Sequence, residues 1–393
     1  MRIIFALILI TLIPLFSSAQ EIINGDQQFQ LYESLVSNKR VAVFANNASQ
    51  VDGQNIVNFL LDHRINITKV FTPEHGFSVA ADAGAAVSKQ SGQFARNLEI
   101  VSLYGKKDKP DVNDLKNVDI LVFDIQDVGV RYYTYISSLQ KLMEAAIQYN
   151  KPLILLDRAN PNSFYIDGPI LESKYKSFVG MQPIPIVYGM TMGEYARMLI
   201  GEQWLDIKPL SKVQQINLII IPVRNYTHAS KYQVMDKPSP NLPNMTAIYL
   251  YPSLGWFEGT QLSIGRGTPM PFQIIGHPAY KTEFSFTPKP TTGAMNPPLK
   301  NQLCYGWDLQ MAPEEVLNQN QNKINLNYLL QAYEKFPDKK IFFTSFFDKL
   351  AGTDKLKQQI IAGYTESQIR ASWQPGLNKF RATRSKYLIY PEN

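Results

Sequence analysis

Cysteine is almost absent from this sequence of 393 residues, and Cys304 is the single example. An intramolecular disulfide is therefore excluded, and a chain of this length can rely on its hydrophobic core for stability. Cys304 is most simply a small buried apolar residue, because no histidine neighbours it and nothing in the sequence would activate its thiol.

Clustered charge is also missing. The sequence has 39 basic and 33 acidic residues, which gives a formal net charge of +6, and no run of five or more basic residues occurs. Such a dispersed surplus does not indicate nucleic-acid binding, although it is compatible with anionic surroundings such as cell-wall polymers.

Several catalytic and cofactor motifs do not occur. No GxGxxG follows an expected strand and no GxxxxGK[ST] is present, so we expect no nucleotide cofactor. The lack of GxSxG weakens an α/β-hydrolase interpretation. No HExxH occurs and the four histidines are not at ligand spacing, so we expect no metal. Carboxylate acid–base catalysis fits the remaining residues.

Only the amino terminus contains a long apolar run. Arg2 precedes the apolar residues 3–16, and small residues follow at positions 17–19. This pattern predicts a secretory signal peptide over residues 1–19. A transmembrane anchor is the less favoured alternative because the run is short, and the lack of a following cysteine excludes a lipoprotein anchor. We expect an exported protein with no stable membrane anchor after cleavage.

Strands and helices are expected to alternate from residue 20 to residue 230. Apolar runs predict strands, and helical spacing predicts helices between them; the strands are 41–45, 67–71, 98–103, 119–125, 153–156 and 216–222, and the helices 56–61, 132–149 and 192–200. This order predicts an α/β fold with a mostly parallel sheet covered on both sides.

Residues 231–393 differ in composition from the first part of the chain, because proline and glycine are frequent between 237 and 298. We expect a smaller α+β unit there, whose loops fold back over the first unit. Its expected helices are 325–336 and 355–361, and its expected strands 340–347 and 386–390. Residues 84–96 are expected to form a loop or lid beside Glu74.

The stretch FTPEHGF, residues 71–77, places two chemical groups directly after a strand. Proline at position 73 ends the strand, and Glu74 and His75 follow before Gly76 allows a sharp turn. Ligands bind at the carboxyl edge of open α/β sheets. A turn-stabilising Glu–His pair is the alternative.

Polar side chains also follow the other expected strands. Asn46 follows the first strand, and Asp124, Gln126 and Asp127 surround the end of the fourth. Each alone is an ordinary turn residue, but their coincidence at one edge predicts a shared cleft.

Two further stretches contain candidate binding residues. In DIQDVGVRYYTYI, residues 124–136, Arg131 and Tyr133 suit a sugar that carries a carboxylate, with an ion pair and core packing as their alternatives. The long irregular stretch 239–278 contains the candidates Asn241, Glu258, Thr260 and Arg266. Glu258 is either a second carboxylate for glycoside chemistry or a structural acceptor of backbone N–H groups.

At residues 71–77, 124–136, 156–161, 187–196, 239–244 and 257–268, the sequence resembles the NamZ-type exo-β-N-acetylmuramidases, in the same order along the chain. The resemblance implies a Rossmann-like domain, a smaller carboxyl-terminal domain and a cleft between them. It also implies release of terminal N-acetylmuramic acid from the non-reducing ends of peptidoglycan fragments, within cell-wall recycling. Its expected substrates are muramic acid–glucosamine disaccharides and muropeptides, and its expected compartment is the periplasm.

The glutamate of the family's PEHG motif is regarded as catalytic, and Glu74 holds that position here. On this basis Glu74 is the expected general acid, His75 orients it or binds the sugar, and Asn160 of LDRANP joins the predicted substrate-binding residues. Arg131 or Arg266 would pair the lactyl carboxylate. The second catalytic group stays open between Glu258, Asp124 or Asp127, and the substrate's own acetamido group. A muropeptide-binding protein and a wall esterase or amidase are the alternatives.

Overall fold

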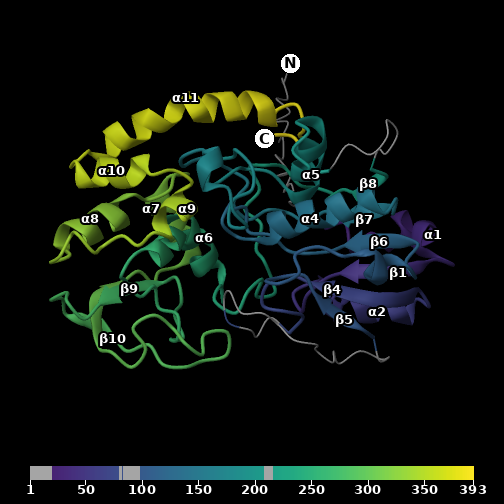
Figure 1. The fold of residues 1–393 in the computed structure, drawn as a ribbon, viewed down its shortest axis with the longest axis horizontal. Helices are drawn as coiled ribbons and strands as arrows, with labels where there is room; N and C mark the ends of the chain where they lie inside the picture. The colour runs from purple at the N-terminus through teal and green to yellow at the C-terminus, as the bar shows by residue number, and fades with distance from the viewer. Residues whose placement is uncertain (1–19, 79–81, 83–97, 208–215) are drawn as a thin grey trace, which may run out of the picture.

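A six-stranded parallel sheet forms the centre of the first half of the chain (Figure 1). The computed structural model describes residues 20–78, 82, 98–207 and 216–393. The predicted signal peptide and the predicted loop at 84–96 lie outside these residues. The sheet order is β5-β4-β1-β6-β7-β8, and the strands are β1 (Arg40–Phe44), β4 (Asn66–Thr72), β5 (Ile100–Ser102), β6 (Ile120–Phe123), β7 (Leu153–Leu156) and β8 (Leu218–Ile221).

All six expected strands are therefore present, and the α/β prediction is confirmed. Counted along the chain, their order in the sheet is 3-2-1-4-5-6, which is the Rossmann order. A separate small hairpin, β2 (Gln50–Val51) and β3 (Gln54–Asn55), interrupts the count without joining the sheet. The switch point, where ligands bind in such sheets, lies between β1 and β6.

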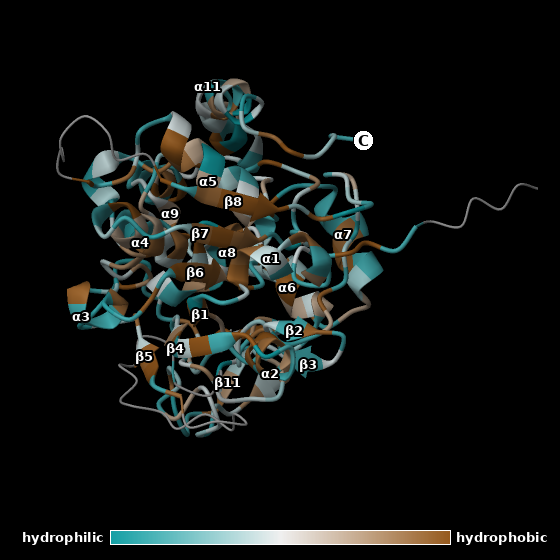
Figure 2. Cartoon of the chain, turned by 90° about the vertical axis from the view of Figure 1, so that its right-hand side faces the viewer, coloured by the Kyte–Doolittle hydropathy of each residue, from teal (hydrophilic) through white to brown (hydrophobic). Residues whose placement is uncertain are grey.

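Helices cover both faces of the sheet, which explains why its strands are apolar without alternation (Figure 2). Alternate side chains of β1 enter different cores: Phe44 packs in the core that includes α4, and Val43 in the core that includes α2. The helices of this unit are η1 (Phe29–Leu31), α1 (Glu33–Val36), α2 (Ile56–Asp62), α3 (Val112–Leu115), α4 (Tyr135–Gln148), η2 (Ser173–Tyr175) and α5 (Met192–Gly201).

The carboxyl-terminal region is smaller and contains helices and an antiparallel sheet of order β10-β11-β9. Its strands are β9 (Ile274–His277), β10 (Phe284–Phe286) and β11 (Cys304–Asp308). Its helices are α6 (Met245–Leu254), η3 (Gly255–Gly259), α7 (Pro313–Asn320), α8 (Asn327–Lys335), α9 (Phe347–Ala351), α10 (Lys355–Ile361) and α11 (Glu366–Arg384). Figure 1 shows α11 running across the top of the molecule from this region to the α/β unit. Cys304 is buried, and burial raises the pKa of its thiol to about 11.

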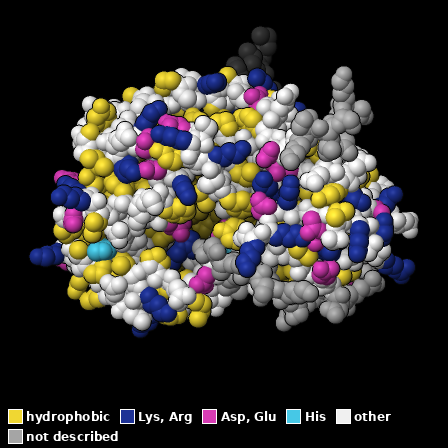
Figure 3. All heavy atoms as spheres, in the orientation of Figure 1, with side chains coloured by type: hydrophobic (Ala, Val, Ile, Leu, Met, Phe, Trp, Pro, Cys, Tyr) yellow, Lys and Arg dark blue, Asp and Glu magenta, His cyan; other side chains and the backbone are white. Residues whose placement is uncertain are grey.

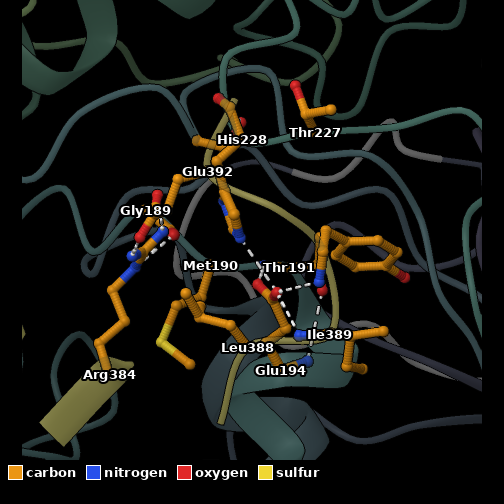
Figure 4. Close-up of polar contacts among 12 residues, drawn as sticks. Gly189, Met190, Thr191, Glu194, Thr227, His228, Arg384, Leu388, Ile389 and Glu392 are labelled. Atoms are coloured by element: carbon orange, nitrogen blue, oxygen red, sulfur yellow. Dashed lines mark hydrogen bonds and ion pairs between the residues drawn. The ribbon is translucent and has the colours of Figure 1, made fainter. Parts of the chain in front are cut away.

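The predicted helices at 325–336 and 355–361 are present as α8 and α10, but both predicted strands of this region are wrong. Residues 340–346 belong to no described strand, although Phe343 forms an isolated bridge with Thr260, and α9 begins at Phe347. Residues 386–390 pair with none of the described strands. The N–H groups of Ile389 and Tyr390 donate instead to the carboxylate of Glu194 in α5 (Figure 4). A side chain has thus replaced the strand partner that these apolar residues would otherwise need.

The same cluster attaches the end of the chain to the α/β unit. Glu194 is fully buried, and His228 Nε2 lies 3.0 Å from the carboxylate oxygen that also accepts from Ile389. Arg384 donates from Nε to the carbonyl of Gly189 at 2.8 Å and pairs with Glu392 (Figure 4). These contacts hold the two regions together.

Charge on the surface follows the expectation from the sequence. On the face drawn in Figure 3, lysine and arginine side chains are interspersed with aspartate and glutamate and form no extended patch of one sign. Among the described helices, none is long and apolar enough to cross a bilayer.

Candidate active site

One cavity, of about 300 Å³, is formed jointly by the two regions of the chain. The α/β unit contributes Glu74 and His75, which follow β4, and the turn that leads into α4. The carboxyl-terminal region contributes Glu258, Thr260 and Arg266. Five tyrosines also line it, namely Tyr104, Tyr132, Tyr133, Tyr135 and Tyr251. Polar groups in an aromatic lining are typical of sites for small organic ligands such as sugars.

Glu74 reaches this cavity because the chain turns sharply after β4. Pro73 ends the strand, and His75 and Gly76 both adopt left-handed backbone conformations, with φ of 69° and 70°. The turn leaves the Glu74 side chain half-buried in the cavity wall.

Two hydroxyl groups hold the Glu74 carboxylate. Thr134 Oγ1 donates to Glu74 Oε2 at 2.7 Å. Tyr104 also forms a hydrogen bond with Glu74, and the pKa of the Tyr104 hydroxyl is raised by burial and by the negative charges of Glu74 and Glu258. Thr134 occupies the cap position of α4 but makes no cap hydrogen bond, so its hydroxyl serves the carboxylate instead.

Glu258 is the second carboxylate of the cavity and belongs to η3. Its Oε1 accepts from Arg266 Nε at 2.9 Å and lies 2.8 Å from Arg266 Nη2. The Arg266 guanidinium also lies 5.0 Å from the ring centroid of Phe272. A carboxylate and a guanidinium from the carboxyl-terminal region thus line the same cavity as the carboxylate that follows β4.

Three of the lining tyrosines donate their hydroxyl groups to backbone carbonyls. Tyr133 and Tyr135 both donate to the carbonyl of Pro238, at 2.8 and 2.9 Å, and their ring centroids are 4.5 Å apart. Tyr132 donates to the carbonyls of Tyr251 and Pro252. Tyr132 and Tyr133 also pack edge-to-face against Tyr251, so the tyrosines of the lining contact one another as well as the cavity.

Comparison with known proteins identifies the family. Two sequence models of the exo-β-N-acetylmuramidase NamZ match the chain, the N-terminal one over residues 41–246 and the C-terminal one over residues 249–390. The chain belongs to the NamZ family. The family resemblance noted in the sequence motifs is therefore confirmed.

Individual relatives agree with this assignment. A peptidoglycan β-N-acetylmuramidase NamZ of Bacillus subtilis is 36% identical over 379 residues, covering 91% of this chain and 89% of that protein. The crystal structure of a DUF1343 family protein from Bacteroides fragilis has a TM-score of 0.84 and 42% identity, covering 95% of this chain and all of that one. A second DUF1343 structure from that organism has a TM-score of 0.74 and 27% identity, with coverage of 94% and 99%. As a NamZ family member, the chain is a glycosidase.

In this NamZ family member the structure brings together some of the residues predicted from sequence and separates others. The cavity lining includes Glu74, His75, Tyr133, Glu258, Thr260 and Arg266. It does not include Asn46, Asp124, Gln126, Asp127, Arg131, Asn160 or Asn241. Each residue of the second group has another partner.

Arg131 is the largest departure from the sequence prediction. Its side chain is fully buried, and its two Nη atoms donate to four backbone carbonyls, those of Pro169, Ile184, Leu350 and Ala351. Burial without a carboxylate partner lowers the pKa of its guanidinium to about 9. Arg131 therefore joins segments of both regions, and we no longer assign it to a substrate carboxylate.

Asp124 is occupied by an ion pair. Arg158 donates from Nε to Asp124 Oδ1 at 2.6 Å and from Nη2 to Asp26 Oδ2 at 2.8 Å, and all three side chains are buried. The cluster has two carboxylates for one guanidinium. Burial, together with the charge of Asp124, raises the pKa of Asp26 to about 7 although Arg158 opposes the shift.

This raised pKa predicts how stability depends on pH. Between pH values of about 4 and 7 the folded chain holds a proton on Asp26 that the unfolded chain releases. The part of the free energy of unfolding that comes from this proton is fully present at the acid end and is lost as pH rises through about 7. Asp26→Asn lacks the group, so we expect its free energy of unfolding to fall less steeply with pH than that of wild type. Urea titrations across this range measure both slopes, and equal slopes would contradict the assignment.

Asp127 and Gln126 are engaged in the turn that follows β6. Asp127 is buried and accepts from the hydroxyl of Tyr188 and from the N–H of Gly129. Burial raises the pKa of Asp127 to about 6. Gln126 donates to the carbonyls of Asp127 and Ala159, at 2.8 and 2.9 Å. Neither side chain extends to the cavity.

The three predicted asparagines also support the backbone or the cavity wall. Asn46 donates to the hydroxyl of Tyr135 at 3.1 Å from behind that wall. Asn160 donates to the carbonyl of Met190 at 2.8 Å, and Asn241 to that of Gly293 at 3.1 Å. No group of three or more His, Cys, Asp or Glu side chains that could hold a metal ion occurs in the described part of the chain.

Thr134, which sequence reasoning missed, supplies a test of how Glu74 is held. Thr134→Val removes the hydroxyl that donates to Glu74, and we expect kcat to fall roughly tenfold, the size of one hydrogen bond to a charged group. Thr134→Ser keeps the hydroxyl and should stay within about twofold of wild type. Steady-state kinetics with thermal unfolding of both variants checks this; equal losses in the two would contradict it.

Proposed function

We propose that this chain releases terminal N-acetylmuramic acid from the non-reducing ends of peptidoglycan fragments, with Glu74 as the general acid. The proposal rests on the presence of two carboxylates in one tyrosine-lined cavity. Glu74 comes from the α/β unit and Glu258 from the carboxyl-terminal region. Glycoside hydrolases characteristically use such a pair across the scissile bond. The Bacillus subtilis relative, named a peptidoglycan β-N-acetylmuramidase, supports the same substrate class.

In the proposed reaction, Glu74 protonates the leaving glycosidic oxygen. The hydroxyls of Thr134 and Tyr104 fix the orientation of the Glu74 carboxyl group, which limits the freedom that proton transfer would otherwise have to overcome. His75, in the same turn and also in the lining, binds the sugar or orients Glu74.

The positions of the carboxylates reduce the number of candidates for the second catalytic group. Asp124 is paired with Arg158 and Asp127 with Tyr188, and neither lines the cavity, so both are withdrawn as candidates. We propose Glu258 as the base that activates water, with the substrate's own acetamido group as the alternative.

The compartment belongs to the proposal as well. The apolar run at residues 3–16, with small residues before position 20, supports export through a signal peptide and a periplasmic location. An exported enzyme would meet the disaccharides and muropeptides that turnover of the wall produces.

The experiment that tests the function is product analysis. The purified protein is incubated with the disaccharide that has N-acetylmuramic acid at its non-reducing end and N-acetylglucosamine at the other. We expect mass spectrometry to detect both free sugars. Calorimetric binding of intact disaccharide without products would instead identify a binding protein, and release of peptide from muropeptides would identify an esterase or amidase.

A further inference from the structure

Arg266 is the only arginine or lysine among the described residues that line the cavity. The cavity also contains the carboxylates of Glu74 and Glu258, so a ligand that brought a third carboxylate would face repulsion unless it met Arg266. Arg266 is therefore the side chain of the lining best suited to bind a negatively charged group of a ligand.

The guanidinium of Arg266 is only partly occupied. Nε and Nη2 both lie within 2.9 Å of Glu258 Oε1, which uses one edge of the planar group. Nη1 is buried and has no hydrogen-bond partner in the described part of the chain. Of the fourteen buried side-chain polar atoms without a partner among the described residues, Nη1 is the one that belongs to a residue lining the cavity. An acceptor brought by a ligand would therefore bind favourably there.

The backbone on both sides of Arg266 packs closely against neighbouring segments. Gly265 and Gly267 flank it, each with φ of +79°. A Cβ at Gly265 would lie 2.6 Å from the carbonyl oxygen of Met270, and a Cβ at Gly267 would lie 2.5 Å from that of Lys289. Only glycine fits at both positions, because a side chain at either would clash with these carbonyl oxygens.

We propose that Arg266 is the specificity-determining residue of this site and that it binds the carboxylate of the substrate's lactyl group through the guanidinium edge that contains Nη1. The inference rests on the proposed function, because this carboxylate is what distinguishes N-acetylmuramic acid from N-acetylglucosamine. A planar guanidinium can donate to one carboxylate along each of two edges, so Arg266 would join Glu258 to the substrate. A neutral sugar would leave Nη1 unpaired and bind less well.

The test compares substrates that differ only at the lactyl group. The substrates are 4-nitrophenyl β-N-acetylmuramide, its lactyl methyl ester and 4-nitrophenyl β-N-acetylglucosaminide. Arg266→Gln should lower kcat/KM for the acid by roughly 10- to 100-fold more than for either neutral substrate. Lys300→Gln removes a positive charge near the lining residue Pro298 without lining the cavity, and it should leave the acid-to-ester ratio within about twofold of wild type.

The ratio of kcat/KM for the acid to kcat/KM for the ester separates the binding role of Arg266 from effects on catalysis. Loss of Arg266 also releases Glu258, which lowers the rate for every substrate, so an equal loss for acid and ester would overturn the proposal. Failure of wild type to cleave the muramide would instead overturn the proposed function. If Arg266→Gln does not fold, Arg266→Lys keeps the charge but loses the second edge, and calorimetry should detect weaker binding of N-acetylmuramic acid with unchanged binding of N-acetylglucosamine. Unchanged binding of both sugars would overturn the proposal.

Discussion

Glu74→Gln is expected to lower kcat/KM for the muramic acid–glucosamine disaccharide by at least about 100-fold, because an amide N–H is far too weak an acid to protonate the leaving oxygen. Glutamine has the shape of glutamate and can still accept from Thr134, so the cavity should keep its form. The loss should be smaller for a 4-nitrophenyl muramide, since nitrophenolate leaves without protonation. Mass-spectrometric and absorbance assays measure the two rates.

The size of the loss on the disaccharide decides the role of Glu74. Glu99→Gln is the matched control, because Glu99 is an exposed glutamate that pairs with Lys69 and does not line the cavity. It should match wild type on both substrates. If Glu74→Gln stays within about tenfold of wild type on the disaccharide, Glu74 is not the general acid.

Arg158→Met is expected to lower the free energy of unfolding by at least about 3 kcal/mol. The change leaves Asp26 and Asp124 buried together with no cation, after losing ion pairs of 2.8 and 2.6 Å. Any carboxylate of the pair that stays ionised is then buried without a partner, which is strongly unfavourable. Equilibrium unfolding in urea measures the effect.

Arg40→Met is the control for this stability prediction. Arg40 also pairs with an aspartate at 2.6 Å, Asp119, but its side chain is 45% exposed. Water already solvates both charges there, so the loss should be small. Comparable destabilisation in the two variants would show that burial is not the cause of the Arg158 effect.

Local patterns predicted the α/β unit because its strands are short, continuous apolar runs. Residues 153–156 form β7 as expected, and the proline at position 73 ends β4 close to the predicted residue. The carboxyl-terminal region was harder to predict. Helix α11 was not predicted, and it contains Pro375, a residue that normally argues against a helix interior. Trp373, Leu377 and Phe380 nevertheless bury one face at helical spacing, and Thr365 caps the helix.

Some residues of the site were also predicted from the sequence and others were not. Glu74, Glu258 and Arg266 were predicted from motifs and their positions, and all three line the cavity. Thr134 was missed, because a threonine at the start of a helix normally signals a cap and nothing nearby in sequence announces a bond to a residue 60 positions away.

What the amino-acid order alone determined was the run of apolar strands, the point at which β4 stops and the membership of the NamZ family. These depend on backbone preference, side-chain periodicity and motif, all of which are local. Only the tertiary structure decided that Arg131 is buried on backbone carbonyls while Arg266 lines the cavity. The reason is that the partner of a charge depends on distances through space, and in a folded chain the nearest opposite charge or carbonyl can be more than two hundred residues away.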